Sequence, residues 1–229
     1  MNPILNYLRS SIGRKQIMGL AGIYLYFFLL IHLVGNFGML SGAEFFNGYG
    51  HLMLHTLKKV VIPIEFTLLA AFVAHIGLSL KLTLENRAAR PDRYAVNASK
   101  AERGPYAKFM MLTGTWLLIF VIAHVPQFRF GAYSGMATAT YNGVEMRDLY
   151  GTALQFFAKP WFAAFYVFSF AMLFSHLAHG VQSSLQSLGL NHPRWNSAVR
   201  IGSKAYSALI CGGFAALAIW AFMQKGAVG

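Results

Sequence analysis

The chain has 229 residues, of which 56% are hydrophobic and only 11% charged, and its formal net charge is +12. A soluble globular protein carries about 25% charged residues, so this composition excludes an ordinary soluble domain, and it is too apolar for a nucleic-acid-binding protein. Cys211 is the single cysteine. It rules out an internal disulfide and any four-cysteine metal centre within the chain.

Five apolar stretches are long enough to cross a bilayer as helices, which needs about 20 residues each. They cover residues 17–40, 60–82, 106–128, 160–185 and 205–223. The sequence therefore predicts an all-α membrane protein, built as a single five-helix bundle over residues 1–229. The first stretch is too long for a signal peptide and has no small-residue cleavage site, so we expect it to be retained.

The distribution of basic residues predicts the orientation of these helices, because lysine and arginine near span ends favour the cytoplasmic side. With a cytoplasmic N-terminus, 13 of the 19 lysines and arginines fall on the cytoplasmic side and 6 on the outer side. We therefore expect the N-terminus inside and the C-terminus outside.

Two connections between spans stand out. The first, at 85–103, is polar and basic, and Pro91 within it is expected to end a helix that overruns the membrane. This loop either binds anionic lipid as a positive-inside segment or docks a cytoplasmic partner. The second connection, at 129–159, is expected to form a cap on the outer side.

Histidines within the spans carry the clearest functional signal, because titratable residues in a bilayer are costly. His32 and His124 fall in the outer halves of their spans. His75, His176 and His179 fall in the inner halves. Two imidazoles that face each other across a bundle can bind a six-coordinate b-type haem. The first four spans are therefore predicted to enclose two haems at two depths.

Alternatives to this interpretation stay open. His176 and His179 are three residues apart on roughly one helix face, and depth alone slightly favours His179 as the partner of His75. A buried membrane histidine can also be a hydrogen-bonded core residue or part of a proton or metal transporter. Another membrane cytochrome b, such as the anchor of a hydrogenase or formate dehydrogenase, would also carry histidine-ligated haems.

A group of polar residues near the second span could exchange protons with a reducible ligand such as a quinone. Glu65 is the only carboxylate within a predicted span. The others precede that span, and the candidates are Glu44, Tyr49, His51, His55 and Glu65. Anchoring at the membrane interface explains such residues as well.

The sequence around these histidines resembles a known family. The segments that carry the resemblance are Lys15–Gly22 leading to His32–Asn36, Ile64–Glu65 leading to His75, Asn86–Pro91 followed by Tyr94, Thr113–Gly114 leading to His124, and His176–Gly180 leading to Gln186–Gly189. They resemble the di-haem cytochrome b membrane anchor, of the b558 type, of succinate:quinone oxidoreductases, which include succinate dehydrogenases and quinol:fumarate reductases.

The resemblance implies a division of labour in a bacterial cytoplasmic membrane. A flavoprotein and an iron–sulfur subunit would bind the cytoplasmic face, and this chain would carry electrons between them and membrane quinone through two haem b. His32 and His124 would ligate the distal haem, and His75 and His176 the proximal one, since Gly180 follows His176 as the family motif requires. Basic residues expected to dock the iron–sulfur subunit or balance haem propionates are Arg14, Lys15, Arg87, Arg90, Arg93, Lys100 and Arg103.

Overall fold

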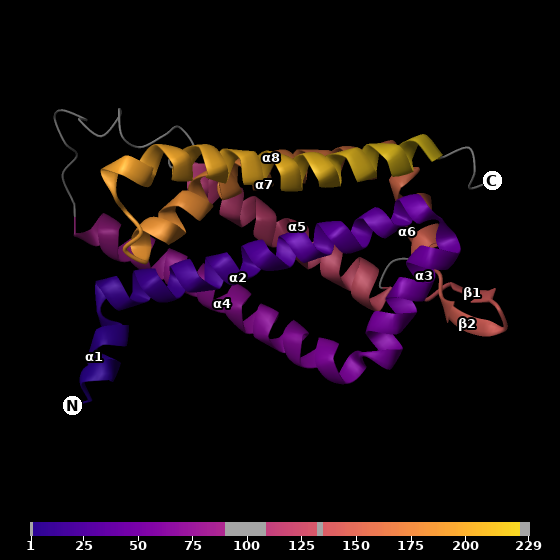
Figure 1. Cartoon of the computed structure of the whole chain (residues 1–229), viewed down its shortest axis with the longest axis horizontal. Helices are drawn as coiled ribbons and strands as arrows, with labels where there is room; N and C mark the ends of the chain where they lie inside the picture. The colour runs from indigo at the N-terminus through magenta and orange to yellow at the C-terminus, as the bar shows by residue number, and fades with distance from the viewer. Residues whose placement is uncertain (1, 90–108, 132–134, 225–229) are drawn as a thin grey trace.

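A computed structural model describes residues 2–89, 109–131 and 135–224, which are 87% helical. Within these ranges five helices are long and apolar enough to cross a membrane, so the predicted all-α, multi-pass architecture is confirmed. These helices are α2 (Ser11–Phe37), α4 (Lys58–Ala88), α5 (Met110–Phe130), α7 (Pro160–Ser187) and α8 (Pro193–Met223). Figure 1 shows them extending along the long axis of the molecule, with α4 spreading away from α7 and α8.

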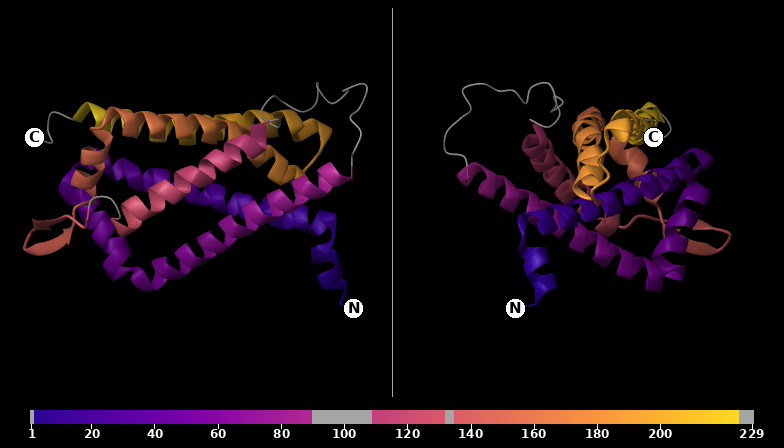
Figure 2. Two further views of the ribbon diagram at one scale, coloured as in Figure 1. Left: turned by 180° about the vertical axis from the view of Figure 1, so that it is seen from behind. Right: turned by 60° about the vertical axis from the view of Figure 1, so that its left-hand side comes forward.

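Shorter elements lie at the two ends of this bundle (Figures 1 and 2). One end carries α3 (Ala43–His51), α6 (Leu149–Phe157) and a hairpin of β1 (Thr138–Tyr141) and β2 (Val144–Arg147). We call it the cap end. The opposite end carries α1 (Pro3–Arg9), and we call it the α1 end. A 3-10 turn (Gly38–Ser41) joins α2 to α3, and a π-helical turn (Leu52–Thr56) joins α3 to α4.

The helices extend beyond the predicted spans where capping residues allow it. Ser10 caps α2 by accepting a hydrogen bond from the backbone of Gly13, so this helix begins before residue 17. Pro193 stands in the first turn of α8, well before the predicted start at 205, because proline suits that position. Helix α4 runs on to Ala88, as expected of a helix that overruns its apolar stretch. Residues 90–108, with Pro91 and the predicted start of the third span, lie outside the described residues.

Helix packing divides the bundle into two layers that meet along α2 and α7. Helix α4 packs on α2, whereas α5 and α8 both pack on α7. The most buried side chains come from the α2, α7 and α8 side, including Leu33, Leu177 and Ile210. Helix α4 instead exposes large apolar side chains such as Phe66 and Val73, which is the surface that lipid tails solvate.

The described residues of the 129–159 connection form the hairpin and α6 at the cap end. Asn142 and Gly143 both have positive φ values, of 53° and 78°, between strands paired from Thr138 opposite Arg147. Such a pair forms the two-residue turn that matches the twist of a hairpin. Fully buried Asn47 of α3 holds this end together, since its side chain donates to Asp148 at 2.9 Å and accepts from the backbone of Tyr150 at 2.9 Å.

Candidate functional site

The histidines of four helices come together as two facing pairs. His32 of α2 and His124 of α5 have ring centroids 5.9 Å apart, with an angle of 83° between the planes. His75 of α4 and His176 of α7 have centroids 6.3 Å apart at 67°. Each pair thus joins one helix of the α2–α4 layer to one helix of the α5–α7 layer. We call them the cap-side pair and the α1-side pair, respectively.

The two pairs lie at separate levels along the bundle. On α7, Tyr166 contacts His124 of the cap-side pair, and His176 of the α1-side pair follows ten residues later. On α2, Gly22 lies against His75, and His32 follows ten residues later. Ten residues of α-helix rise about 15 Å. The same separation on two helices shows that the levels are parallel layers across the bundle.

Hydrogen bonds at Nδ1 orient the rings of the α1-side pair. His75 Nδ1 lies 3.3 Å from the carbonyl oxygen of Met18, which can only accept. His176 Nδ1 lies 3.2 Å from the hydroxyl of Thr113, whose own hydrogen is donated to the carbonyl of Phe109 at 2.9 Å. Both Nδ1 atoms can donate in this arrangement, and with the proton on Nδ1 each Nε2 would keep the lone pair that a metal ion needs.

Aromatic side chains support the cap-side pair. His124 Nδ1 is 3.1 Å from the hydroxyl of Tyr166, and its ring stacks on Phe120 at 5.4 Å. His32 stacks on Phe28 at 5.2 Å. Asn36, one turn further along α2, places its amide 3.4 Å from His32 Nδ1. These contacts hold both rings in fixed planes.

The spacing of each pair fits one metal ion between two imidazoles. A bound imidazole nitrogen lies about 2 Å from its metal, so two rings on opposite sides of one ion have centroids roughly 6 Å apart. The measured separations are 5.9 and 6.3 Å. Among the described residues, no group of three or more His, Cys, Asp or Glu side chains could hold a metal ion. Each pair offers two imidazoles, a number of protein ligands that would suit a metal already held by a macrocycle such as haem.

Two glycines leave room beside the α1-side pair. A Cβ atom on Gly22 would stand 3.5 Å from His75 Cε1, and one on Gly114 would stand 3.4 Å from His176 Cε1. Each glycine thus borders a histidine ring on the helix opposite. Gly180, by contrast, packs against the hydroxyl of Tyr26. Larger side chains at Gly22 or Gly114 would press on the rings themselves.

The structure distinguishes between the two adjacent histidines of α7. His176 is the ring that faces His75, and its Nδ1 is held by Thr113. His179 is one turn along the same helix and is partly buried. Of the two rings, His176 is therefore the one that faces His75, and which of them binds a haem stays a prediction.

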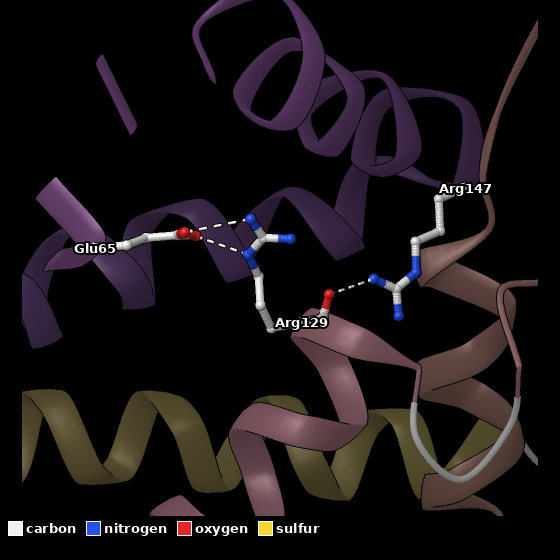
Figure 3. A network of polar contacts seen from close by, with 3 residues as sticks. All are labelled: Glu65, Arg129 and Arg147. Atoms are coloured by element: carbon white, nitrogen blue, oxygen red, sulfur yellow. Dashed lines mark hydrogen bonds and ion pairs between the residues drawn. The ribbon is translucent and has the colours of Figure 1, made fainter. Parts of the chain in front are cut away.

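Polar residues at the cap end form a network that the sequence did not reveal. Arg129 of α5 forms an ion pair with Glu65 of α4, with Nε and Nη2 at 2.8 and 3.2 Å from the carboxylate oxygens (Figure 3). Arg147 of β2 donates from Nη1 to the carbonyl of Arg129 at 2.9 Å. The spans alone could not identify the two arginines, because Arg129 ends a helix and Arg147 lies in the hairpin.

Arg147 carries an excess positive charge in this network. Its Nε and Nη2 atoms are buried and have no hydrogen-bond partner among the described residues. Burial lowers the pKa of its guanidinium, and the neighbouring charge of Arg129 lowers it further. Two arginines against one carboxylate leave a site that is electrostatically suited to a further anionic group.

The five residues suggested for quinone chemistry do not form a single cluster. Glu65 pairs with Arg129, and Glu44 accepts a hydrogen bond from Asn142 of the hairpin at 2.7 Å. Tyr49 packs against Gly35 on α2, one turn beyond His32. The two remaining candidates, His51 and His55, stack on each other with centroids 4.4 Å apart.

The basic residues suggested for docking are placed only in part. Arg14 forms an ion pair with Glu85 at 2.6 Å, which ties α2 to α4 at the α1 end. Lys15 and Arg87 are exposed at the same end. The other four, Arg90, Arg93, Lys100 and Arg103, lie outside the described residues.

No protein-family model, curated protein or solved structure matches this chain. Its function is therefore inferred from the two histidine pairs, their surroundings and the resemblance of the sequence segments that contain them.

Proposed function

We propose that this chain is the membrane anchor and di-haem electron-transfer subunit of a succinate dehydrogenase or fumarate reductase complex. The proposal rests on the cap-side pair and the α1-side pair of facing histidines. Their ring centroids are 5.9 and 6.3 Å apart, and the four rings come from four membrane helices. The choice of succinate:quinone oxidoreductases over other respiratory complexes is supported by the resemblance of the histidine-containing segments.

In this proposal His32 and His124 hold one haem b, and His75 and His176 hold the other. Haem b, when bound, supplies reversible one-electron transfer. Met18 and Thr113 hold the α1-side rings by Nδ1 and direct Nε2 into the site. Because the two levels are about 15 Å apart, the histidines align the two groups along the path from one membrane surface to the other.

The surroundings supply the remaining needs of a haem. Gly22 and Gly114 keep side-chain bulk away from the α1-side rings. Arg129 lies five residues beyond His124, about 7 Å further towards the cap end. Because Arg129 is already paired with Glu65, it and Arg147 together would leave one positive charge to balance a propionate carboxylate of a haem at the cap-side pair.

Quinone reduction needs protons as well as electrons, and the cap end holds groups that can supply them. Glu44, Glu65, His51 and His55 are candidates to supply protons, and the Tyr49 hydroxyl is a further polar group there. We propose that quinone binds near this end and that these side chains deliver its two protons.

The opposite face would bind the soluble partners. The excess of basic residues at the α1 end makes it the cytoplasmic side by the positive-inside rule, in a bacterial cytoplasmic membrane. Exposed Lys15 and Arg87 are available there to dock an iron–sulfur subunit, which in turn would hold a flavoprotein. Succinate and fumarate chemistry would take place on that flavoprotein.

A haem-to-protein ratio, combined with a reduced-minus-oxidised spectrum of the purified membrane protein, tests the proposal. We expect two b-type haems per chain, and one in each of the variants His32→Ala, His75→Ala, His124→Ala and His176→Ala. A protein with no visible absorption would overturn the haem assignment and favour a transporter.

Purification from the native membrane adds a second readout. Two haems together with hydrogenase or formate dehydrogenase subunits would overturn the succinate assignment alone.

A further inference from the structure

The α1 end carries a feature that electron transfer does not use. Helix α1 turns sharply away from α2 and projects to the side of the bundle axis (Figures 1 and 2). Ile4 and Leu8 lie one turn apart on one face of α1, with Leu5 beside them, and all three are exposed. Asn6 projects from the opposite side of the same helix, and Arg9 lies on the flank next to Leu5.

The bend between the two helices is built into the sequence. The Ser10 hydroxyl donates to the carbonyl of Tyr7 at 2.6 Å and accepts from the backbone of Gly13 at 3.1 Å. Gly13 is required here, because a Cβ atom would collide with the Tyr7 carbonyl oxygen. The direction of α1 is thus set by local contacts and does not depend on a partner.

The depth of α1 is also defined. The hydroxyl of Tyr7 donates to the side chain of Gln16 at 2.5 Å, so α1 lies beside the first turns of α2. At this level Arg14 pairs with Glu85 of α4. Charged residues on two membrane-spanning helices mark the level of the lipid headgroups. A helix that leaves α2 at a large angle there must run along the membrane surface.

The charge of the neighbourhood indicates which surface α1 contacts. Residues 1–43 contain no aspartate or glutamate, and Arg9 and Lys15 are exposed beside the apolar face. A short helix with apolar residues on one side and basic residues nearby matches the boundary between anionic headgroups and acyl chains. A soluble acidic partner would complement the charges but would leave Ile4 and Leu8 against a polar surface.

We propose that α1 is an interfacial anchor, whose Ile4, Leu5 and Leu8 insert into the anionic leaflet at the α1 end. Tyr7, at the same level, lies in the interfacial region that tyrosine prefers. Anchoring of this kind fixes the tilt of α2 at the point where it enters the membrane. The proposal requires only that α2 spans the bilayer, so it stands whether or not the chain binds haem.

Spin labels on single cysteines test the proposal in the full chain, reconstituted into vesicles of phosphatidylglycerol and phosphatidylethanolamine. Cys211→Ala removes the only native thiol. Single cysteines carrying a spin label then replace Ile4, Leu8, Asn6 or Arg9. Power saturation measures how often each label collides with oxygen, which is enriched in lipid, and with a nickel chelate, which stays in water. Reference labels at exposed Leu69 of α4 and exposed Glu145 of the hairpin give the lipid and water limits.

We expect labels at Ile4 and Leu8 to show an oxygen-to-nickel ratio several-fold above that at Asn6, with the label at Arg9, on the flank, between them. Equal and high nickel access at all four positions would overturn the proposal, because α1 would then face water. Shielding of Ile4 and Leu8 from both reagents would overturn it in favour of a protein contact. In a Gly13→Ala background the contrast should shrink, and an undiminished contrast would show that the bend does not position α1.

Discussion

Thr113 and His176 are joined by a hydrogen bond of 3.2 Å between the threonine hydroxyl and the histidine Nδ1. The hydroxyl can accept because its hydrogen is already donated to a backbone carbonyl one turn earlier in the chain. A side chain that is not itself a ligand therefore decides which nitrogen of the histidine faces the α1-side site.

Replacing Thr113 by valine should weaken haem binding at the α1-side pair, because His176 would lose the acceptor that fixes its tautomer and plane. Loss of such an outer partner typically costs about 10-fold or more in metal affinity. Haem titration of the purified protein, followed by absorbance, measures the effect. Thr83→Val is the matched control, since Thr83 contacts Met111 rather than a histidine. Equal affinity in the two variants would contradict the role given to Thr113.

The adjacent histidines of α7 should behave differently when replaced. His176→Ala is expected to leave one haem per chain, because His75 loses the ring that faces it at 6.3 Å. His179→Ala is expected to keep both haems. The haem-to-protein ratio distinguishes them, and the reverse result would make His179 the ligand.

A bulky residue at Gly114 should eliminate the α1-side haem while sparing the other. A Cβ atom there is already 3.4 Å from His176, so the leucine side chain of Gly114→Leu would displace the ring. We expect one haem per chain and an unchanged cap-side spectrum. Gly212→Leu is the control, since a Cβ atom at Gly212 on α8 meets nothing within 4 Å. If Gly114→Leu keeps two haems per chain, the His176 ring can move aside without loss of the haem, which would contradict the prediction.

Glu65→Gln separates a structural role from a proton-transfer role. The ion pair with Arg129 is about two-fifths exposed on both sides, so its loss should cost at most about 1 kcal/mol of stability. If Glu65 delivers protons to quinone, quinone reduction should nevertheless fall while haem content stays at two. Glu145→Gln, on the exposed hairpin, is the control. Unchanged quinone kinetics would remove Glu65 from the candidates.

Asn47 should matter for stability rather than for electron transfer. Its fully buried side chain bonds Asp148 and the backbone of Tyr150, so Asn47→Ala leaves buried polar groups without partners. We expect a loss of about 2 kcal/mol, seen as a lower Tm in detergent, with haem content unchanged at low temperature. Asn142→Gly, which keeps the hairpin turn, should cost much less.

The long helices were predictable because their signal is additive. Twenty apolar residues in a row identify a membrane helix whatever their order, and the depth of His32, His75 and His124 follows from counting along it. The ends were less predictable: α8 begins at Pro193 rather than near 205, because proline and the capping histidine before it start the helix outside the apolar stretch.

Contacts between segments distant in sequence could not be read in advance. Asn142–Gly143 is a local hairpin signal in the sequence, but the contact of β2 with α3 depends on residues about 100 positions apart. The ion pair of Glu65 with Arg129 depends on how α4 and α5 cross. The preference for His176 over His179 depends on helix rotation, which a difference of three residues does not reveal.

The ten-residue interval between the two levels has a consequence for the evolution of the chain. Helices α2 and α7 each serve both levels, through Gly22 and His32 and through Tyr166 and His176. Deleting one residue between them would rotate one level by about 100° against the other. We therefore expect related chains to keep the number of residues between positions 22 and 32 and between positions 166 and 176, while the residues within these segments change.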